Sequence, residues 1–227
     1  MNDPICIIVP AYNEEQVIKE TLQSLIDLNY QVIVIDDGSQ DETYSIINNL
    51  PVYSIRHSVN LGAGAAIQTG LNFALELGAR IIITFDADGQ HDANDIEGMI
   101  QPILEGKSDI VIGSRFLRKE DTQLVPLSKR ILLRGAVIVN GLLTGIWLSD
   151  AHNGFVVMNN EAAKKVYFNE NRYAYLTEFL LQIRKLKLRY VERPTSIIYS
   201  DYSMSKGQSP WNALNILIDF FIGRLFR

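Results

Sequence analysis

The stretch IIITFDADGQH, residues 81–91, joins an apolar run to a cluster of polar residues. The run IIIT indicates a strand that is covered on both faces, as in a parallel sheet. It leads into Asp86 and Asp88, followed by Gly89 and Gln90. Residues two apart in an extended chain point to the same side, so the two carboxylates can converge on a hard cation such as Mg²⁺ or Mn²⁺. Taken alone, the pattern more often marks a solvated turn, because Asp, Gly and Gln are all common in turns.

Apolar runs of the same kind recur along the first half of the chain, separated by stretches with helical periodicity. This alternation predicts βαβ units and an α/β fold with a mainly parallel sheet and helices on both faces. The expected strands are 5–10, 31–36, 51–55, 80–86 and 109–113, and the expected helices between them are 15–28, 42–49, 65–77 and 92–104.

Polar segments follow each of these strands, at the sheet edge where ligands bind in such folds. They read PAYNEE (10–15), DDGSQD (36–41), NLGAG (60–64), DADGQ (86–90) and GSR (113–115). Carboxylates such as Asp36 and Asp37 can accept hydrogen bonds from a base or a ribose. The alternative is local capping by Ser39 or Asp41 ahead of the next helix. The clustering predicts one site at this edge.

Composition narrows the class of protein. The chain has 227 residues and a net charge of −5, which disfavours nucleic acid as a partner. Its single cysteine, Cys6, excludes an internal disulfide and a CxxC metal site. We expect a cytoplasmic location, because there is neither a signal-like N-terminus nor a run of about 18 apolar residues. No GxSxG or GxxxxGK[ST] motif is present, and NLGAGAA does not complete a dinucleotide-binding motif.

The second half of the chain is less regular. We expect a helix over 127–145, a loop entering a strand over 150–158, a helix over 175–187, and strands over 189–194 and 195–200. Residues 201–209 show no periodicity. We expect 211–227 to form an apolar-faced helix that can dock on the domain, form a homodimer or contact a membrane peripherally. The expected division is a domain over 1–210 and this C-terminal amphipathic helix.

Basic residues follow the fifth strand, and they suggest a second anion such as a phosphorylated acceptor. They are Arg115, Lys129, Arg130 and Arg134. Surface ion pairing is the alternative for at least two of them. His91 and His152 lack metal-ligand spacing and are expected in turns or in support of a site.

The five strand-end motifs, in this order, resemble family 2 glycosyltransferases of the GT-A type. Within that family they are similar to the dolichyl-phosphate mannose synthase-like branch, the polyprenyl-phosphate glycosyltransferases. The resemblance is specific over 4–116 and weaker at DAHNGF (150–155), ERP (192–194) and KGQS (206–209). It implies a GT-A-like Rossmann-type sandwich. It also implies inverting transfer of a sugar from a UDP- or GDP-sugar to a polyprenyl phosphate, or to another glycan precursor of the cell envelope.

The resemblance also implies roles for individual residues. A Mg²⁺ or Mn²⁺ ion would be held by Asp86, Asp88 and Gln90, with Asp88 as the leading direct ligand. A phosphate acceptor is already anionic and needs no strong base, whereas a hydroxyl acceptor would need Asp150 or Glu178. The acceptor phosphate would be bound by Arg115 and by Lys129 or Arg130. The nucleotide sugar would be bound by Pro10, Ala11, Asn13, Glu14, Asp37, Asp86 and Lys206.

Two positions depart from the family pattern. Ala63 stands where many relatives carry lysine or another large residue, and Tyr202 stands where many carry arginine. These departures keep open a non-catalytic module that binds nucleotide sugars. A sugar-nucleotide pyrophosphorylase is a further alternative, although PAYNEE lacks the glycine-rich, arginine-bearing loop that such enzymes need.

Overall fold

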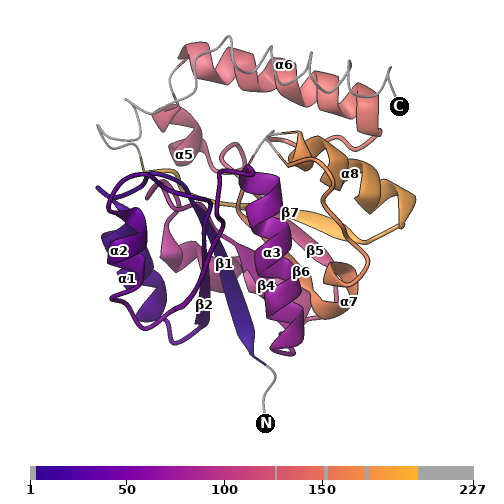
Figure 1. The fold of residues 1–227 in the computed structure, drawn as a ribbon. Helices are drawn as coiled ribbons and strands as arrows, with labels where there is room; N and C mark the ends of the chain where they lie inside the picture. Colours follow the sequence, from indigo (N-terminus) through magenta and orange to yellow (C-terminus); the bar gives the residue numbers. More distant parts are fainter. Residues whose placement is uncertain (1–3, 126, 151–152, 172–173, 199–227) are drawn as a thin grey trace.

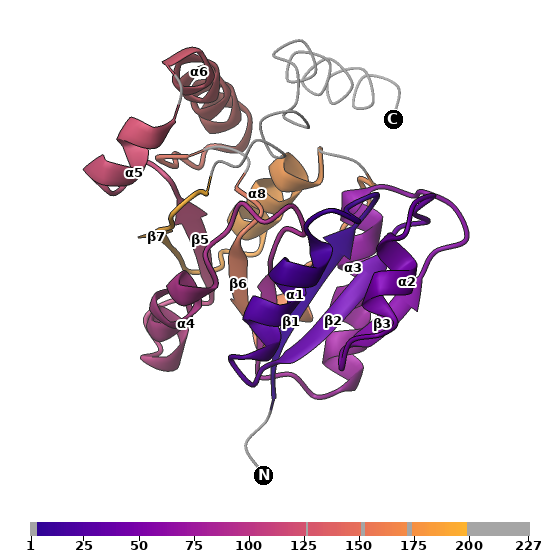
Figure 2. The ribbon, with the colours of Figure 1, turned by 90° about the vertical axis from the view of Figure 1, so that its left-hand side faces the viewer.

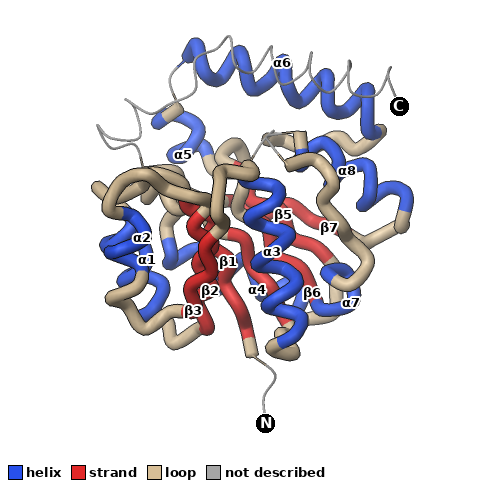
Figure 3. The backbone as a smooth tube through the Cα atoms, in the orientation of Figure 1, coloured by secondary structure: helices blue, strands red, loops and turns tan. Residues whose placement is uncertain are grey.

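A seven-stranded sheet with the order β3-β2-β1-β4-β6-β5-β7 organises the chain (Figure 3). The computed structural model describes residues 4–125, 127–150, 153–171 and 174–198. Its strands are β1 Ile5–Ala11, β2 Gln31–Asp36, β3 Tyr53–Arg56, β4 Ile81–Thr84, β5 Ile110–Ser114, β6 Val156–Asn159 and β7 Tyr190–Pro194.

The pairing of the strands confirms a mainly parallel sheet. Strands β2 and β4 flank β1 in parallel, β3 pairs parallel to β2, and β7 pairs parallel to β5. Strand β6 is antiparallel to both β4 and β5, with Thr84 opposite Val156. The carboxyl ends of β1, β2, β4 and β5 therefore meet at one edge of the sheet, while β6 begins there.

Helices cover both faces of the sheet, so the protein has two apolar cores. In β1, Cys6 and Ile8 face one core while Ile7 and Val9 face the other, as the two-residue period of a strand requires. The helices are α1 Ile18–Ile26, α2 Thr43–Ile47, α3 Ala63–Glu76, α4 Ile96–Leu104, α5 Lys119–Leu124, α6 Leu127–Thr144, α7 Asn160–Ala163 and α8 Tyr175–Lys185, with a 3₁₀ turn at Ala93–Asp95.

Helices α5 and α6 lie at the end of the sheet where the parallel strands finish, away from the N-terminus (Figures 1 and 2). Helix α6 is joined to α8 by the Arg184 guanidinium, whose Nη1 donates to the Thr144 carbonyl at 2.9 Å. Among the helices of the described residues, none combines the length and the apolar character needed to cross a membrane.

One expected strand is absent from the described part of the chain, and several expectations lie beyond what the structure describes. Residues 195–198 do not form the expected strand, since Ile197 makes only an isolated bridge to His91. Strand β7 already completes the edge next to β5, and the chain turns from it toward β4. The expected C-terminal helix over 211–227, the division at residue 210, Tyr202 and Lys206 all lie outside the described residues.

Candidate active site

The segments that follow β1, β2 and β4 are joined to one another at the carboxyl edge of the sheet. The Asn13 amide donates to Ser39 Oγ at 2.9 Å, and the Glu14 amide donates to Thr43 Oγ1 at 2.7 Å. Thr21 Oγ1 donates to the Ala87 carbonyl at 3.4 Å, which connects α1 to the segment after β4. The polar segments expected at separate strand ends therefore form one surface.

Asp86 and Asp88 lie just past the end of β4, where Gly89 turns the chain with a φ of 73°. The Asp86 side chain is 40% exposed, so a ligand can reach it. Its Oδ2 accepts a hydrogen bond from His91 Nε2 at 2.9 Å, while Asp88 Oδ1 accepts from the Gln90 amide at 3.0 Å. This conformation brings both carboxylates to one turn, as the sequence predicts.

The two carboxyl groups have opposite electrostatic settings. Burial, and then the charge of Asp86, raise the pKa of Asp88 to about 6. Burial acts in the same direction on Asp86, but the charge and hydrogen bond of His91 and the charge of Arg115 together lower the pKa of Asp86. Repulsion within this pair would be relieved by a cation.

The donor set fits a hard divalent cation. The two carboxylates are followed by the side-chain amide of Gln90, and all three supply oxygen, which Mg²⁺ and Mn²⁺ prefer. Within the described ranges, no group of three or more His, Cys, Asp or Glu residues is placed to hold a metal ion. Two carboxylates would leave coordination positions for phosphate oxygens.

The first-strand residues expected to hold the nucleotide lie on this edge. Pro10 and Ala11 end β1, and Asn13 follows with a φ of 55° and accepts from the Gln40 amide at 2.8 Å through Oδ1. The charge of Glu14 acts on the turn after β4, since it contributes to raising the pKa of Asp88. The structure therefore brings the PAYNEE segment and the DADGQ segment together.

Asp37 has a structural task that the sequence did not reveal. Its Oδ1 accepts from His57 Nδ1 at 2.7 Å and from the Leu61 amide at 3.0 Å, and its Oδ2 accepts from the Gly62 amide at 2.7 Å. The carboxylate is buried and fixes the loop that leads into α3. Its expected contact with a nucleotide stays a prediction.

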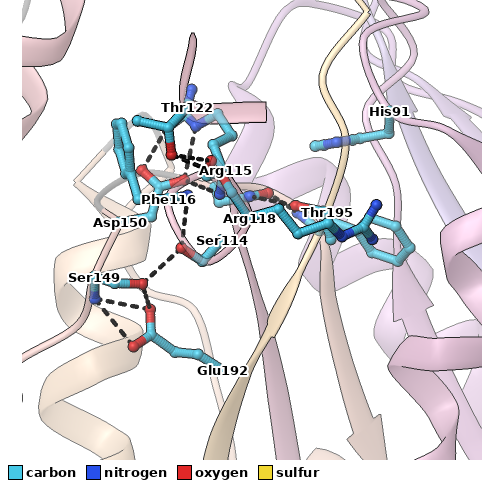
Figure 4. Close-up of polar contacts among 12 residues, drawn as sticks. His91, Ser114, Arg115, Phe116, Arg118, Thr122, Ser149, Asp150, Glu192 and Thr195 are labelled. Atoms are coloured by element: carbon cyan, nitrogen blue, oxygen red, sulfur yellow. Dashed lines mark hydrogen bonds and ion pairs between the residues drawn. The ribbon is translucent and has the colours of Figure 1, made fainter. Parts of the chain in front are cut away.

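Arg115 and Asp150 are paired in the structure (Figure 4). Arg115 Nε and Nη2 donate to Asp150 Oδ2 and Oδ1, each at 2.7 Å, and the Arg115 amide donates to Oδ2 at 3.1 Å. Both residues are buried. A bidentate pair of this kind fixes the guanidinium plane, so Asp150 orients Arg115.

A second polar cluster holds the Asp150 segment in place (Figure 4). The amide and the hydroxyl of Ser149 both donate to the Glu192 carboxylate, at distances of 2.7–3.0 Å. Ser149 Oγ also lies 2.6 Å from Ser114 Oγ. Strands β5 and β7 thereby fasten the segment that carries Asp150. The weak motif matches at 150–155 and 192–194 were the only sequence signals for this cluster.

The other candidate base and acceptor residues lie in different settings. Glu178 caps a loop, since its carboxylate accepts from the Asn169 and Glu170 amides and from Asn169 Nδ2 at 2.9–3.0 Å. Arg130 Nη2 donates to the Thr122 carbonyl at 2.6 Å, at the end of α5. Lys129 lies in α6, and its side chain is not among those described. Of the four acceptor and base candidates with described side chains, only Arg115 and Asp150 are brought together.

Comparisons with known proteins agree with this architecture. A model described as glycosyl transferase family 2 matches residues 6–167. An uncharacterized protein of Methanocaldococcus jannaschii is 38% identical over 227 residues, which cover 99% of this chain and 93% of that protein. A Methanococcus voltae protein named UDP-N-acetylglucosamine–dolichyl-phosphate N-acetylglucosaminyltransferase is 37% identical, with 96% of this chain and 92% of that one covered. The dolichol-phosphate mannosyltransferase of Pyrococcus furiosus is 30% identical, with 90% and 60% covered.

Solved structures share the fold at low sequence identity. Glucosyl-3-phosphoglycerate synthase from Mycobacterium tuberculosis, in complex with phosphoglyceric acid, has a TM-score of 0.69 at 18% identity and covers 96% of this chain and 80% of its own. The same enzyme with Mn²⁺, uridine diphosphate and glucosyl-3-phosphoglycerate has a TM-score of 0.67 at 19% identity, with the same coverage. The GT-A-like sandwich expected from the sequence is confirmed.

Proposed function

The chain belongs to glycosyl transferase family 2, and from this premise we propose that it moves a sugar, with inversion, from a nucleotide-diphosphate sugar to a polyprenyl phosphate. A phosphate oxygen of the acceptor would attack the anomeric carbon on the face opposite the nucleotide. The bond to the nucleoside diphosphate breaks, and the diphosphate leaves with the electron pair. The product is a sugar linked to the lipid through one phosphate.

One donor is favoured by similarity. The Methanococcus voltae relative, named for UDP-N-acetylglucosamine and dolichyl phosphate, is 37% identical over nearly the whole chain. UDP-N-acetylglucosamine is therefore the first donor to test, with other UDP- and GDP-sugars as the panel. Asp86, Asp88 and Gln90 would hold a Mg²⁺ or Mn²⁺ ion, which when bound neutralises charge on the diphosphate. The Mn²⁺ and uridine diphosphate in the synthase complex support this proposal.

A phosphate acceptor is supported by one observation: both candidate bases already accept hydrogen bonds from other residues of the protein. Asp150 accepts three hydrogen bonds from Arg115 alone, and Glu178 accepts three from residues 169–170. A hydroxyl acceptor would need a carboxylate that can take its proton, whereas a phosphate brings its own negative charge. The oriented guanidinium of Arg115, whose charge lowers the pKa of Asp86, suits such an anion.

The acceptor class is tested with matched lipids. The protein is given UDP-N-acetylglucosamine and Mn²⁺ with either a polyprenyl phosphate or the corresponding free polyprenol, and release of UDP is measured. We expect UDP to be released with the polyprenyl phosphate and not with the free polyprenol. We also expect Arg115→Lys to raise the acceptor KM more than it lowers kcat, because it loses the planar fork but keeps the charge. Equal release with the free alcohol would contradict the proposed acceptor class.

A further inference from the structure

The carboxylate of Asp86 is held from two sides by residues that the metal-site motif does not include. One is Gly154, from the segment entering β6, and the other is His91, three residues past Asp88. Asp86 Oδ2 is taken by His91, while Oδ1 makes no hydrogen bond within the described part of the chain. The conformation of this one side chain therefore depends on both neighbours.

Gly154 lies where a side chain would collide with Asp86. The register of β4 and β6 ends with Thr84 opposite Val156, and just beyond it Thr84 Oγ1 donates to the Gly154 carbonyl at 2.6 Å. A Cβ on Gly154 would lie 2.4 Å from Asp86 Oδ1, 2.7 Å from Oδ2 and 2.8 Å from Cγ. Any residue larger than glycine would push the carboxylate out of its place.

His91 is buried, and within the described residues only one of its two ring nitrogens has a hydrogen-bond partner. Its side chain is 3% exposed, and its ring centroid lies 5.3 Å from those of Phe85 and Phe155. Nε2 lies 2.9 Å from Asp86 Oδ2, but Nδ1 is buried without a hydrogen-bond partner. A buried unpaired polar atom destabilises the fold. A phenyl ring would fill the same place without a buried unpaired nitrogen. What histidine adds over phenylalanine here is therefore the hydrogen bond from Nε2 to Asp86.

We propose that Gly154 and His91 are positioning residues for Asp86, fixing its carboxylate so that Oδ2 is held by the protein and Oδ1 is left for the cation. The inference rests on the proposed function, because it assigns the cation to Asp86 and Asp88. It explains why DAHNGF and the histidine after DADGQ belong to the site although neither needs to touch the substrate. Partners of metal ligands commonly act in this way, through the ligand they orient.

The test measures Mn²⁺ affinity directly. Free Mn²⁺ is followed by electron paramagnetic resonance during titration of the full chain, in the presence of UDP and, separately, of GDP. The variants are Gly154→Ala, His91→Phe and His91→Gln, where glutamine restores an N–H donor. The matched control is Gly98→Ala in α4, where a Cβ meets nothing within 4 Å. Melting temperatures without metal report folding separately.

We expect Gly154→Ala and His91→Phe each to raise the Mn²⁺ dissociation constant about 10- to 100-fold. His91→Gln should recover part of the affinity, and Gly98→Ala should bind as the unaltered protein does. His91→Phe should change the metal-free melting temperature little, because the loss of the hydrogen bond to Asp86 is offset by the removal of a buried unpaired nitrogen. If Gly154→Ala does not fold, His91→Phe carries the test alone.

Unchanged Mn²⁺ affinity in the folded variants would overturn the inference, and so would a lower melting temperature with unchanged affinity, which indicates a merely structural role. Failure of the unaltered protein to bind Mn²⁺ with either nucleotide is a different result. It would overturn the proposed function, and the inference with it.

Discussion

Asp88 is a carboxylate whose ionisation should weaken the folded protein when no cation is bound. Its pKa is raised to about 6, so the folded protein binds this proton more tightly than an unfolded chain with a pKa near 3.8 does. Between these values the unfolded carboxyl ionises while the folded one stays protonated. The metal-free protein therefore loses stability as the pH rises from about 4 to about 6. The negative charge that a cation needs is held there at a cost to the fold.

This predicts the effect of Asp88→Asn. At pH 7.5 the variant without metal should be more stable to urea by roughly 1–2 kcal/mol. The full shift in pKa corresponds to about 3 kcal/mol, and partial solvent exposure reduces it. The gain should vanish near pH 4, and Mn²⁺ with UDP should no longer raise the melting temperature. A gain that persists unchanged at pH 4 would show that the charge of Asp88 is not its source.

At the scale of single residues, the sequence indicates candidate metal ligands more readily than it indicates which side chains hydrogen-bond to each other. Asp86 and Asp88 are two residues apart, so their meeting follows from local geometry. The pairing of Arg115 with Asp150 bridges 35 residues and depends on Ser149 and Glu192, which no local pattern connects. Glu178, a possible base, illustrates the same difficulty, since an acidic residue in a helix gives no sign that it caps the loop ahead of that helix.

At the scale of elements, the start of α3 depends on one carboxylate. Asp37 receives hydrogen bonds from His57, Leu61 and Gly62 and so fixes the loop between β3 and α3. This loop borders the segments after β1 and β2, where a nucleotide is expected. The shape of that region is thus set by a side chain at the end of the neighbouring strand.

Asp37→Ala should destabilise the protein by about 2–4 kcal/mol in urea unfolding, because buried donors left without an acceptor cost about 1–3 kcal/mol each. Amide hydrogen exchange over residues 57–62 should speed up. The control is Thr69→Val, which removes the far contact at His57 Nε2 and the hydroxyl's hydrogen bond to the Ala65 carbonyl but leaves Asp37 in place, and it should cost within about 1 kcal/mol. Unchanged stability in Asp37→Ala would mean that this carboxylate is not needed by the loop.

The elements of the first half were predictable because strand and helix periodicities alternate there. Strands expected at 31–36 and 109–113 appear as Gln31–Asp36 and Ile110–Ser114. The antiparallel insertion of β6 between β4 and β5 was not predicted, because sequence order gives no sign of it. The expected strand over 195–200 failed because the chain leaves the sheet after β7 and crosses to the segment that follows β4, where Ile197 makes only an isolated bridge to His91. Its β-branched residues fit a strand, but they give no sign of this change of direction.

At the scale of the whole molecule, the sheet brings the motifs together into one site. Parallel strands β1, β2, β4 and β5 bring their ends to one edge, while β6 runs the other way and delivers Gly154 to Asp86. Helices α5 and α6 lie beyond that edge (Figure 1). The Asp86–Gln90 turn, the segments after β1 and β2, and the Arg115–Asp150 pair thus share one end of a sheet that is covered on both faces.

Analysis of the lipid product shows which bond the enzyme makes. The protein is incubated with Mn²⁺, UDP-N-acetylglucosamine and dolichyl phosphate, and the product is analysed by mass spectrometry and by NMR of the anomeric centre, with EDTA as the control. We predict a lipid carrying one phosphate and one sugar, with the anomeric configuration opposite to that of the donor, and none with EDTA. A product carrying two phosphates, or one that keeps the configuration of the donor, would contradict the account.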